Sequence, residues 1–200
     1  RVRKLDYSIQ LSKLFYERFI NDEDITLFSP HEVPELYEAW GTDKFDELYE
    51  VAERKTSVSK KKVSAQTLFF DMLKERAETG RIYIMNIDHC NSHSSFKDRV
   101  YMSNLCQEIT LPTDPIQHID GSGEIALCIL SAINVGKLNY LDDLEGLCDL
   151  AVRALDEIID HQKYPVKAAE VSTKARRSLG IGYIGLAHYL AKNKLKYSDK

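Results

Sequence analysis

The chain has 200 residues, of which 44% are hydrophobic, and a formal net charge of −4 at pH 7. This length and composition suit one domain, or a piece of a larger one, and the slight acidity argues against a surface that coats nucleic acid. Four cysteines are too few for a disulfide scaffold, no apolar run approaches the roughly 18 residues that span a bilayer, and no signal-peptide pattern opens the chain, so the sequence predicts a soluble protein of a reducing compartment.

Helical and strand patterns alternate along the chain, which favours an α/β fold with parallel strand pairing. The predicted elements of the first third are a helix with the apolar stripe Leu11, Leu14, Phe15 and Phe19, a strand at 24–28, a short helix from Pro34 toward Trp40, and a charged helix that ends near Arg54. The basic run 60–62 leads into the next helix, so we expect it to be a solvated helix face. That helix has apolar residues at i, i+3, i+4, i+7 and i+8 from Ala65, and we expect it to end at Gly80.

Two nearly unbroken apolar runs, 82–87 and 125–130, are typical of strands that are covered on both faces. The longest predicted helix covers 142–161 and has a capping-box-like start at Asp142 and Glu145. Cys148 lies on the apolar stripe of this helix, so we expect it to pack in the core. A last strand-like run at 178–184 is predicted to pass into a helix.

The segment 103–113, SNLCQEITLPT, places a thiol between an amide and a carboxylate. If this backbone is extended, Asn104, Cys106 and Glu108 project from one face, because side chains of an extended chain alternate with period two. Such a face could hold a hydroxyl-bearing substrate through Asn104, remove its proton with Glu108 and attack through Cys106. The alternative is that Cys106 is a small buried hydrophobic residue.

His89, Cys90 and His93 form an H-C-x-x-H pattern, here named the HCxxH cluster, after a predicted strand. Structural zinc generally takes four ligands, and apart from the single residues His118 and Cys106 the sequence offers no suitable partner. We therefore expect ordinary hydrogen bonds and no metal here. A small metal-binding interaction domain is the alternative.

The segment 180–185 matches G-x-G-x-x-G and leads from a strand-like run into a helix, which is the context of a dinucleotide fingerprint. Close strand–helix packing is the preferred explanation of these glycines. The alternative is a nucleotide-binding module without redox chemistry that uses the turn from Gly180 to Gly185.

Five segments together resemble one protein family. They are SNLCQEITLPT at 103–113, GEIALCILSAIN at 123–134, DITLFSPHEVPELYEAW at 24–40, TGRIYIMNIDHCNSH at 79–93 and RRSLGIGYIGLAHYLAK at 176–192. They resemble the catalytic large subunit of class I ribonucleotide reductase, along all 200 residues but over only a middle portion of that family's longer chain. We therefore expect residues 1–200 to be an excised segment of one catalytic domain.

The resemblance implies a ten-stranded α/β barrel in which Cys106 lies on an inner loop. It implies that a thiyl radical on Cys106 removes the 3′ hydrogen of a ribonucleoside diphosphate, that Glu108 takes the 3′-hydroxyl proton, and that Asn104 binds the ribose hydroxyls. Loss of the 2′-oxygen as water follows. Cys128 corresponds to one of two cysteines that reduce the substrate and become a disulfide, and its partner would lie outside this chain.

The resemblance also implies the partners of the whole protein. No cofactor would be bound directly by this segment, because a metal-containing small subunit supplies the radical. Thioredoxin or glutaredoxin would re-reduce the cysteines, ATP and deoxynucleotide effectors would bind elsewhere in the full chain, and the large subunit would form a homodimer. We expect a cytoplasmic protein without nucleic-acid or membrane partners, and an isolated segment without activity.

Overall fold

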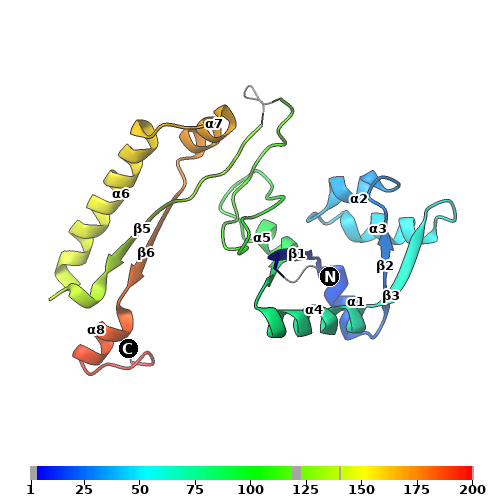
Figure 1. Cartoon of the computed structure of the whole chain (residues 1–200), viewed down its shortest axis with the longest axis horizontal. Helices are drawn as coiled ribbons and strands as arrows, with labels where there is room; N and C mark the ends of the chain where they lie inside the picture. Colours follow the sequence, from blue (N-terminus) through cyan, green and yellow to red (C-terminus); the bar gives the residue numbers. More distant parts are fainter. Residues whose placement is uncertain (1–3, 119–122, 140, 200) are drawn as a thin grey trace. The chain divides into compact units, whose positions relative to one another are not determined.

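The computed structural model of the chain describes residues 4–118, 123–139 and 141–199. The chain separates into two compact units, a first unit that covers Arg1–Pro112 and a second unit that covers Thr113–Lys200 (Figure 1).

The first unit contains two short sheets with helices between their strands. Its elements in order are β1 (Tyr7–Leu11), α1 (Lys13–Ile20), β2 (Asp24–Phe28), α2 (Pro34–Ala39), α3 (Phe45–Arg54), β3 (Lys60–Ser64), α4 (Ala65–Thr79), β4 (Ile82–Asn86) and α5 (Ile87–Ser92). Strands β1 and β4 pair in parallel, and β2 and β3 pair antiparallel. The strand at 24–28, the helices that end near Trp40 and Arg54, and the helix that ends at the left-handed Gly80 are as predicted.

The main hydrophobic core of the first unit is built from β1, β2 and the helices α1 to α4. Its buried residues include Leu11, Leu14, Phe15, Ile25, Leu36, Phe45, Tyr49 and Ala52. Strand β1 contributes one face only, because its sequence YSIQL alternates apolar and polar residues. Ile9 and Leu11 join the core, while Ser8 and Gln10 project from the opposite face.

Two predictions for the first unit are wrong. Leu11 belongs to β1, so the predicted helical stripe begins only at Leu14; the helix starts after Ser12, whose Oγ accepts a hydrogen bond from the amide of Phe15 at 3.3 Å. The basic run 60–62 is no helix face but part of β3, which pairs with β2 along its whole length. Pairing with a distant strand decides the conformation of such a short segment, and local propensity does not.

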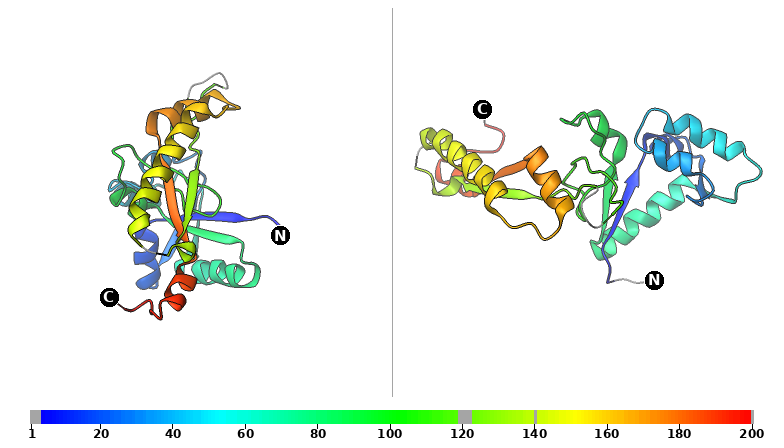
Figure 2. Two further views of the ribbon diagram at one scale, coloured as in Figure 1. Left: turned by 90° about the vertical axis from the view of Figure 1, so that its left-hand side faces the viewer. Right: turned by 90° about the horizontal axis from the view of Figure 1, so that it is seen from above.

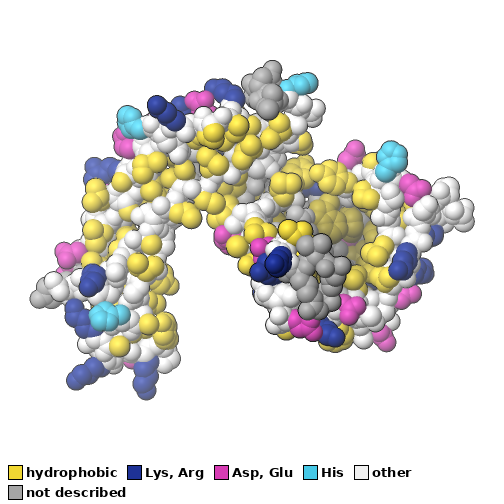
Figure 3. Space-filling view, viewed as in Figure 1, with side chains coloured by type: hydrophobic (Ala, Val, Ile, Leu, Met, Phe, Trp, Pro, Cys, Tyr) yellow, Lys and Arg dark blue, Asp and Glu magenta, His cyan; other side chains and the backbone are white. Residues whose placement is uncertain are grey.

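The second unit is a parallel strand pair with a long helix packed beside it, as both views in Figure 2 show. Its elements are β5 (Ile129–Asn134), two 3₁₀ turns (Val135–Lys137 and Leu141–Asp143), α6 (Leu144–His161), α7 (Lys167–Arg176), β6 (Leu179–Ile184) and α8 (Leu186–Lys192). Ile129, Leu155 and Ile159 form the buried core between strand β5 and helix α6. Hydrophobic side chains lie on the surface of this unit in the space-filling view (Figure 3). The exposed ones include Leu130, Leu150, Tyr183 and Ile184.

Three predictions for the second unit need correction. The strand predicted at 125–130 begins only at Ile129, so Cys128 lies before it in irregular backbone and is exposed. Asp143 caps α6 without a side-chain hydrogen bond, which excludes the predicted capping box. Cys148 is exposed instead of packed; its neighbours Leu147, Leu150 and Ala151 face β5 and line a pocket of about 310 Å³ there.

The α/β character and the parallel pairing of two sheets agree with the sequence-based prediction. Within residues 4–118, 123–139 and 141–199, the strands form three separate two-stranded sheets, and none of them closes. A ten-stranded barrel is therefore not visible in this chain alone. No helix in these ranges has the length and apolar character to cross a membrane.

Candidate active site

Cys106 lies in a turn, outside any helix or strand. The amide of Gln107 donates a hydrogen bond of 3.1 Å to the carbonyl oxygen of Asn104, and Gln107 has a left-handed φ of 66°. The assumption of an extended backbone, which placed the side chains of Asn104, Cys106 and Glu108 on one face, is therefore wrong. The segment 104–107, here named the Cys106 turn, replaces it.

Asn104 holds this loop together. Its Oδ1 accepts hydrogen bonds from the amide of Ile109 at 3.1 Å and from Oγ of Ser103 at 3.0 Å. Cys106 and Glu108 are both exposed. The alternative of a buried, packed Cys106 is thus not what the structure of this chain shows.

Side chains on the polar face of strand β1 hold this loop by hydrogen bonds. Ser8 Oγ donates to the carbonyl oxygen of Leu105 at 2.7 Å, and Gln10 Nε2 donates to the carbonyl oxygen of Tyr101 at 2.9 Å. Trp40 Nε1 donates to Gln10 Oε1 at 2.5 Å. Ser8 and Gln10 were not among the predicted site residues, although the alternation in YSIQL indicates a strand with one polar face.

Tyr83 is a third residue beside the Cys106 turn that was not predicted from the sequence. It lies on β4 directly opposite Ser8 in the parallel register. Its interaction with the neighbouring Cys106 side chain raises the pKa of Tyr83 above its ordinary value. The phenol therefore stays protonated to higher pH than that of a free tyrosine.

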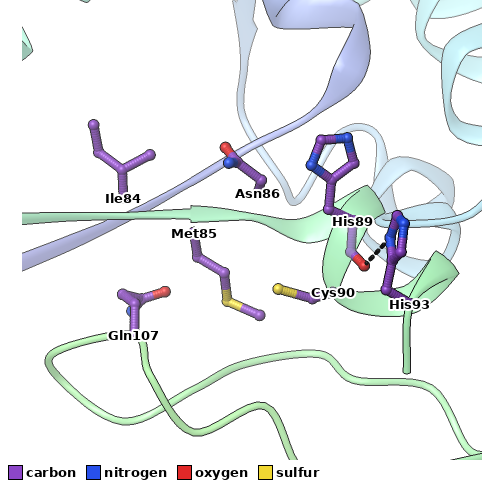
Figure 4. A pocket seen from close by; sticks show the side chains of 7 residues that line it. All are labelled: Ile84, Met85, Asn86, His89, Cys90, His93 and Gln107. Carbon is purple, nitrogen blue, oxygen red and sulfur yellow. Dashed lines mark hydrogen bonds between the residues drawn. The ribbon is translucent and has the colours of Figure 1, made fainter. Parts of the chain in front are cut away.

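A pocket of about 370 Å³ lies beside the Cys106 turn (Figure 4). Its lining residues are Ile84, Met85, Asn86, His89, Cys90, His93 and Gln107. Met85 and Cys90 lie on the side of β4 and α5 that faces the segment carrying Gln107. The pocket thus connects the HCxxH cluster to the residue that follows Cys106.

The HCxxH cluster makes ordinary hydrogen bonds in this structure. His93 Nδ1 lies 3.2 Å from the carbonyl oxygen of His89 and 3.0 Å from Oγ of Ser92. Burial raises the pKa of the Cys90 thiol, which disfavours the thiolate that a metal would need. In the part of the chain that the structure describes, no three His, Cys, Asp or Glu side chains are placed to hold a metal ion. That no metal binds there stays a prediction.

The glycine-rich segment of the second unit is explained by packing. Gly180 and Gly182 lie inside β6, and Gly185 adopts a left-handed φ of 75° where α8 begins. A Cβ at Gly185 would lie 2.5 Å from Oδ1 of Asn134, so a side chain cannot be accommodated there. Two of the three glycines are thus strand residues and not part of a phosphate-binding turn.

The candidate reducing cysteine, Cys128, has no partner thiol among the described residues. Cys128 and Cys148 are exposed free thiols of the second unit, as Cys106 is of the first.

Comparison with known proteins gives a consistent result. Residues 1–200 match the family model described as "Ribonucleotide reductase, barrel domain". The chain is 57% identical over 205 residues to ribonucleoside-diphosphate reductase subunit alpha of Haemophilus influenzae, and 53% identical to ribonucleoside-diphosphate reductase 1 subunit alpha of Escherichia coli (strain K12). It is 42% identical over 207 residues to the subunit alpha of Enterobacteria phage T4. Each alignment covers 100% of this chain and 27% of the relative, so the chain spans about a quarter of the length of the curated relatives that it matches.

Proposed function

The chain belongs to the ribonucleotide reductase family, with a match to its barrel domain, and we propose that it is part of a large subunit that reduces ribonucleoside diphosphates to DNA precursors. The observation that carries this proposal is the family match over every residue of the chain. The motif around Cys106, a thiol next to an amide and a carboxylate, supports the same chemistry.

In the proposed reaction, a thiyl radical on Cys106 takes the 3′ hydrogen of the ribose, which forms an S–H bond and leaves a radical at C3′. Glu108 takes the proton of the 3′-hydroxyl as a general base. The 2′-hydroxyl takes a proton from one of two reducing thiols, Cys128 and a second cysteine outside this chain, and leaves as water. The thiol pair then supplies a hydrogen to C2′ and an electron to the 3′-ketone and becomes a disulfide, while Glu108 returns its proton to the 3′-oxygen. Cys106 finally gives its hydrogen back to C3′, which regenerates the thiyl radical.

The geometry of the Cys106 turn refines the proposed role of Asn104. Its Oδ1 already accepts two hydrogen bonds within the loop. The group left for a substrate is therefore the amide N–H₂, which can donate to a ribose hydroxyl oxygen. Asn104 would thus bind substrate with one end of its amide and shape the loop with the other.

Radical chemistry requires a site from which water is excluded. Cys106 and Glu108 are exposed in this chain, which spans about a quarter of the relatives. We propose that other segments of a closed ten-stranded barrel cover them, with residues 1–200 forming part of that single catalytic domain and the Cys106 turn on its inner side.

The remaining partners follow from the same proposal. A metal-containing small subunit would supply the radical, and thioredoxin or glutaredoxin would re-reduce the disulfide of Cys128. ATP and deoxynucleotide effectors would bind elsewhere in the full chain. We propose a cytoplasmic enzyme whose large subunit forms a homodimer.

Three variants of the full-length subunit, assayed with its small subunit, test the division of labour. Cys106→Ser should abolish turnover, because an oxygen-centred radical is too costly to form. Cys128→Ser should allow hydrogen abstraction and water loss but then stall, releasing base and sugar fragments. Glu108→Gln should bind substrate and react roughly 10²–10⁴ times more slowly, which is the typical size of a general-base contribution.

Cys148→Ser is the matched control, because Cys148 is also an exposed free thiol, and it should retain the wild-type rate. Deoxynucleotide and free base are quantified for all four variants. If Cys106→Ser turns over, the proposed mechanism is wrong. If Cys128→Ser makes deoxynucleotide at the wild-type rate over many turnovers, Cys128 is not a reducing cysteine.

A further inference from the structure

One face of the β1–β4 sheet is occupied by the loop that carries Cys106. Ser8 and Gln10 project from this face of β1, and Tyr83 is paired with Ser8 across the sheet, so the three side chains lie on the same side. Each contacts the loop: Ser8 at Leu105, Gln10 at Tyr101, and Tyr83 at Cys106 itself. We name Ser8, Gln10 and Tyr83 the β1–β4 platform.

Gln10 is fixed in one orientation. The indole N–H of Trp40 can only donate, and it points to Oε1 of Gln10. The amide N–H₂ of Gln10 is therefore left to donate to the carbonyl oxygen of Tyr101. Trp40 is held in turn by Arg99, whose guanidinium donates to the carbonyl oxygens of Glu38, at 2.7 Å, and of Trp40.

Ser8 and Tyr83 hold two consecutive residues of the Cys106 turn. Ser8 donates to the backbone carbonyl oxygen of Leu105 at 2.7 Å, and the side chain of Tyr83 interacts with that of Cys106. Neighbouring strands are about 4.8 Å apart, so the two contacts lie side by side. One fixes the position of the turn and the other fixes the direction of the thiol.

The hydrogen bonds inside the loop cannot fix the position of the turn on the sheet or the direction of the thiol. The bonds of Asn104 to Gln107 and Ile109 set the shape of the turn but leave it free to move as a unit over the sheet. Hydrogen transfer needs reacting atoms about 3–3.5 Å apart, and a 1 Å misplacement can cost about 10²-fold in rate. A thiyl centre on an irregular loop therefore needs a rigid support beneath it.

We propose that Ser8, Gln10 and Tyr83 are positioning residues, which hold the Cys106 thiol on the rigid β1–β4 sheet at the place where it meets the substrate. The role of the thiol rests on the proposed function. The holding of the turn by the platform does not, because it concerns contacts within this chain.

The first test is spectroscopic and needs no activity. The full-length subunit is labelled with fluorotyrosine, the Tyr83 resonance is assigned by its loss in Tyr83→Phe, and its titration is followed by ¹⁹F NMR. In Cys106→Ala, Tyr83 should ionise at lower pH than in the wild type, because the group that raises its pKa is gone. Ser8→Ala, which leaves Cys106 intact, should shift the Tyr83 titration in the same direction by releasing the turn.

The second test is kinetic. Ser8→Ala and Tyr83→Phe should each lower kcat by roughly 10- to 100-fold with little change in KM, since the substrate still binds while the thiol is misplaced. Ser8→Thr keeps the hydroxyl and should restore most of the rate. Tyr183→Phe is the matched control, because Tyr183 is an exposed tyrosine of the second unit, and it should have wild-type kinetics.

The two tests distinguish a failure of this inference from a failure of the proposed function. If the Tyr83 titration is the same in the wild type, Cys106→Ala and Ser8→Ala, the platform does not hold Cys106 and this inference is wrong. If Ser8→Thr is as slow as Ser8→Ala, the hydroxyl of Ser8 is not the positioning group. If the wild-type protein reduces no nucleotide while Tyr83 still responds to Ser8→Ala, the platform stands and the proposed function fails.

Discussion

Replacing Tyr49 by phenylalanine should weaken strand β2 at one residue. The hydroxyl of Tyr49 donates to the carbonyl oxygen of Thr26 at 2.7 Å and accepts from the amide of Thr26 at 2.6 Å. The backbone N–H and C=O of Thr26 thus point away from β3, where Lys62 is the residue paired with Thr26 in the antiparallel ladder. The hydroxyl of Tyr49, a residue of α3, thus makes the two hydrogen bonds that a third strand would make with Thr26 at this edge of the sheet.

The size of the effect follows from burial. Thr26 is 2% exposed and Tyr49 is 5% exposed, so water does not replace the lost hydroxyl. A buried polar group left without a hydrogen bond costs about 1–3 kcal/mol, and Tyr49→Phe leaves two such groups while keeping the ring. We expect a loss of about 2–4 kcal/mol in local stability, which corresponds to about 30- to 1,000-fold faster exchange of the Thr26 amide.

Native-state hydrogen exchange of the full-length protein measures this quantity at the Thr26 amide. Tyr37→Phe is the control, because Tyr37 is 67% exposed and should leave exchange unchanged. If the Thr26 amide in Tyr49→Phe exchanges within about threefold of the wild-type rate, the hydroxyl does not stabilise this edge and the reasoning is wrong.

The same substitution should remove an alkaline transition. Burial raises the pKa of Tyr49 from its ordinary value of 10 to about 12. The stability that comes from the neutral phenol is therefore complete below pH 10 and is lost as the pH rises toward 12. Tyr49→Phe should lack this loss, which exchange measured across that range detects.

Three further predictions concern Glu53, the HCxxH cluster and Gly80. Burial opposes ionisation of Glu53, but hydrogen bonds from Arg18 and Thr26 outweigh it and lower its pKa. The stability that ionised Glu53 adds to the fold is therefore complete above the ordinary pKa of a glutamate, and it is lost as the pH falls through the lowered pKa of the folded state. In unfolding experiments, Glu53→Gln should cost about 1–2 kcal/mol at pH 7 and should weaken the loss of stability in acid. Elemental analysis should find no stoichiometric zinc in the wild type; zinc that is lost in Cys90→Ser would contradict us. Gly80 has a φ of 67°, and a Cβ at this position would meet no atom within 4 Å, so Gly80→Ala should lower thermal stability by about 1 kcal/mol through backbone strain alone.

Elements with a strong local signal were predictable from the sequence. The helix at 65–79 has an apolar period and a terminal glycine, and α6 has a long stripe. Strands β1 and β3 were missed because each has only five residues and depends on a partner that is distant in the sequence. Helix α7 was missed because its sequence, KAAEVSTKAR, has little apolar periodicity.

The candidate site was predictable in its residue types but not in its geometry. The motif identified Asn104, Cys106 and Glu108, yet a left-handed Gln107 turns the backbone where we assumed an extended run. A non-glycine residue with positive φ is uncommon, and nothing in the motif indicates one here. Ser8 lies 97 residues from Leu105 in the chain, so only the folded sheet brings them together.

The strand pair of the second unit supports the proposed larger barrel on physical grounds. Parallel sheets are normally covered on both faces, because crossover helices and neighbouring layers bury them. Helix α6 contacts the face of β5 and β6 that carries Ile129 and Ile181. The other face, with Leu130 60% exposed above Gly180, has no cover within the described part of the chain. An apolar parallel pair with one bare face is unstable in water, so we infer that further segments of the full-length protein pack against it, as the barrel proposed for the Cys106 chemistry requires.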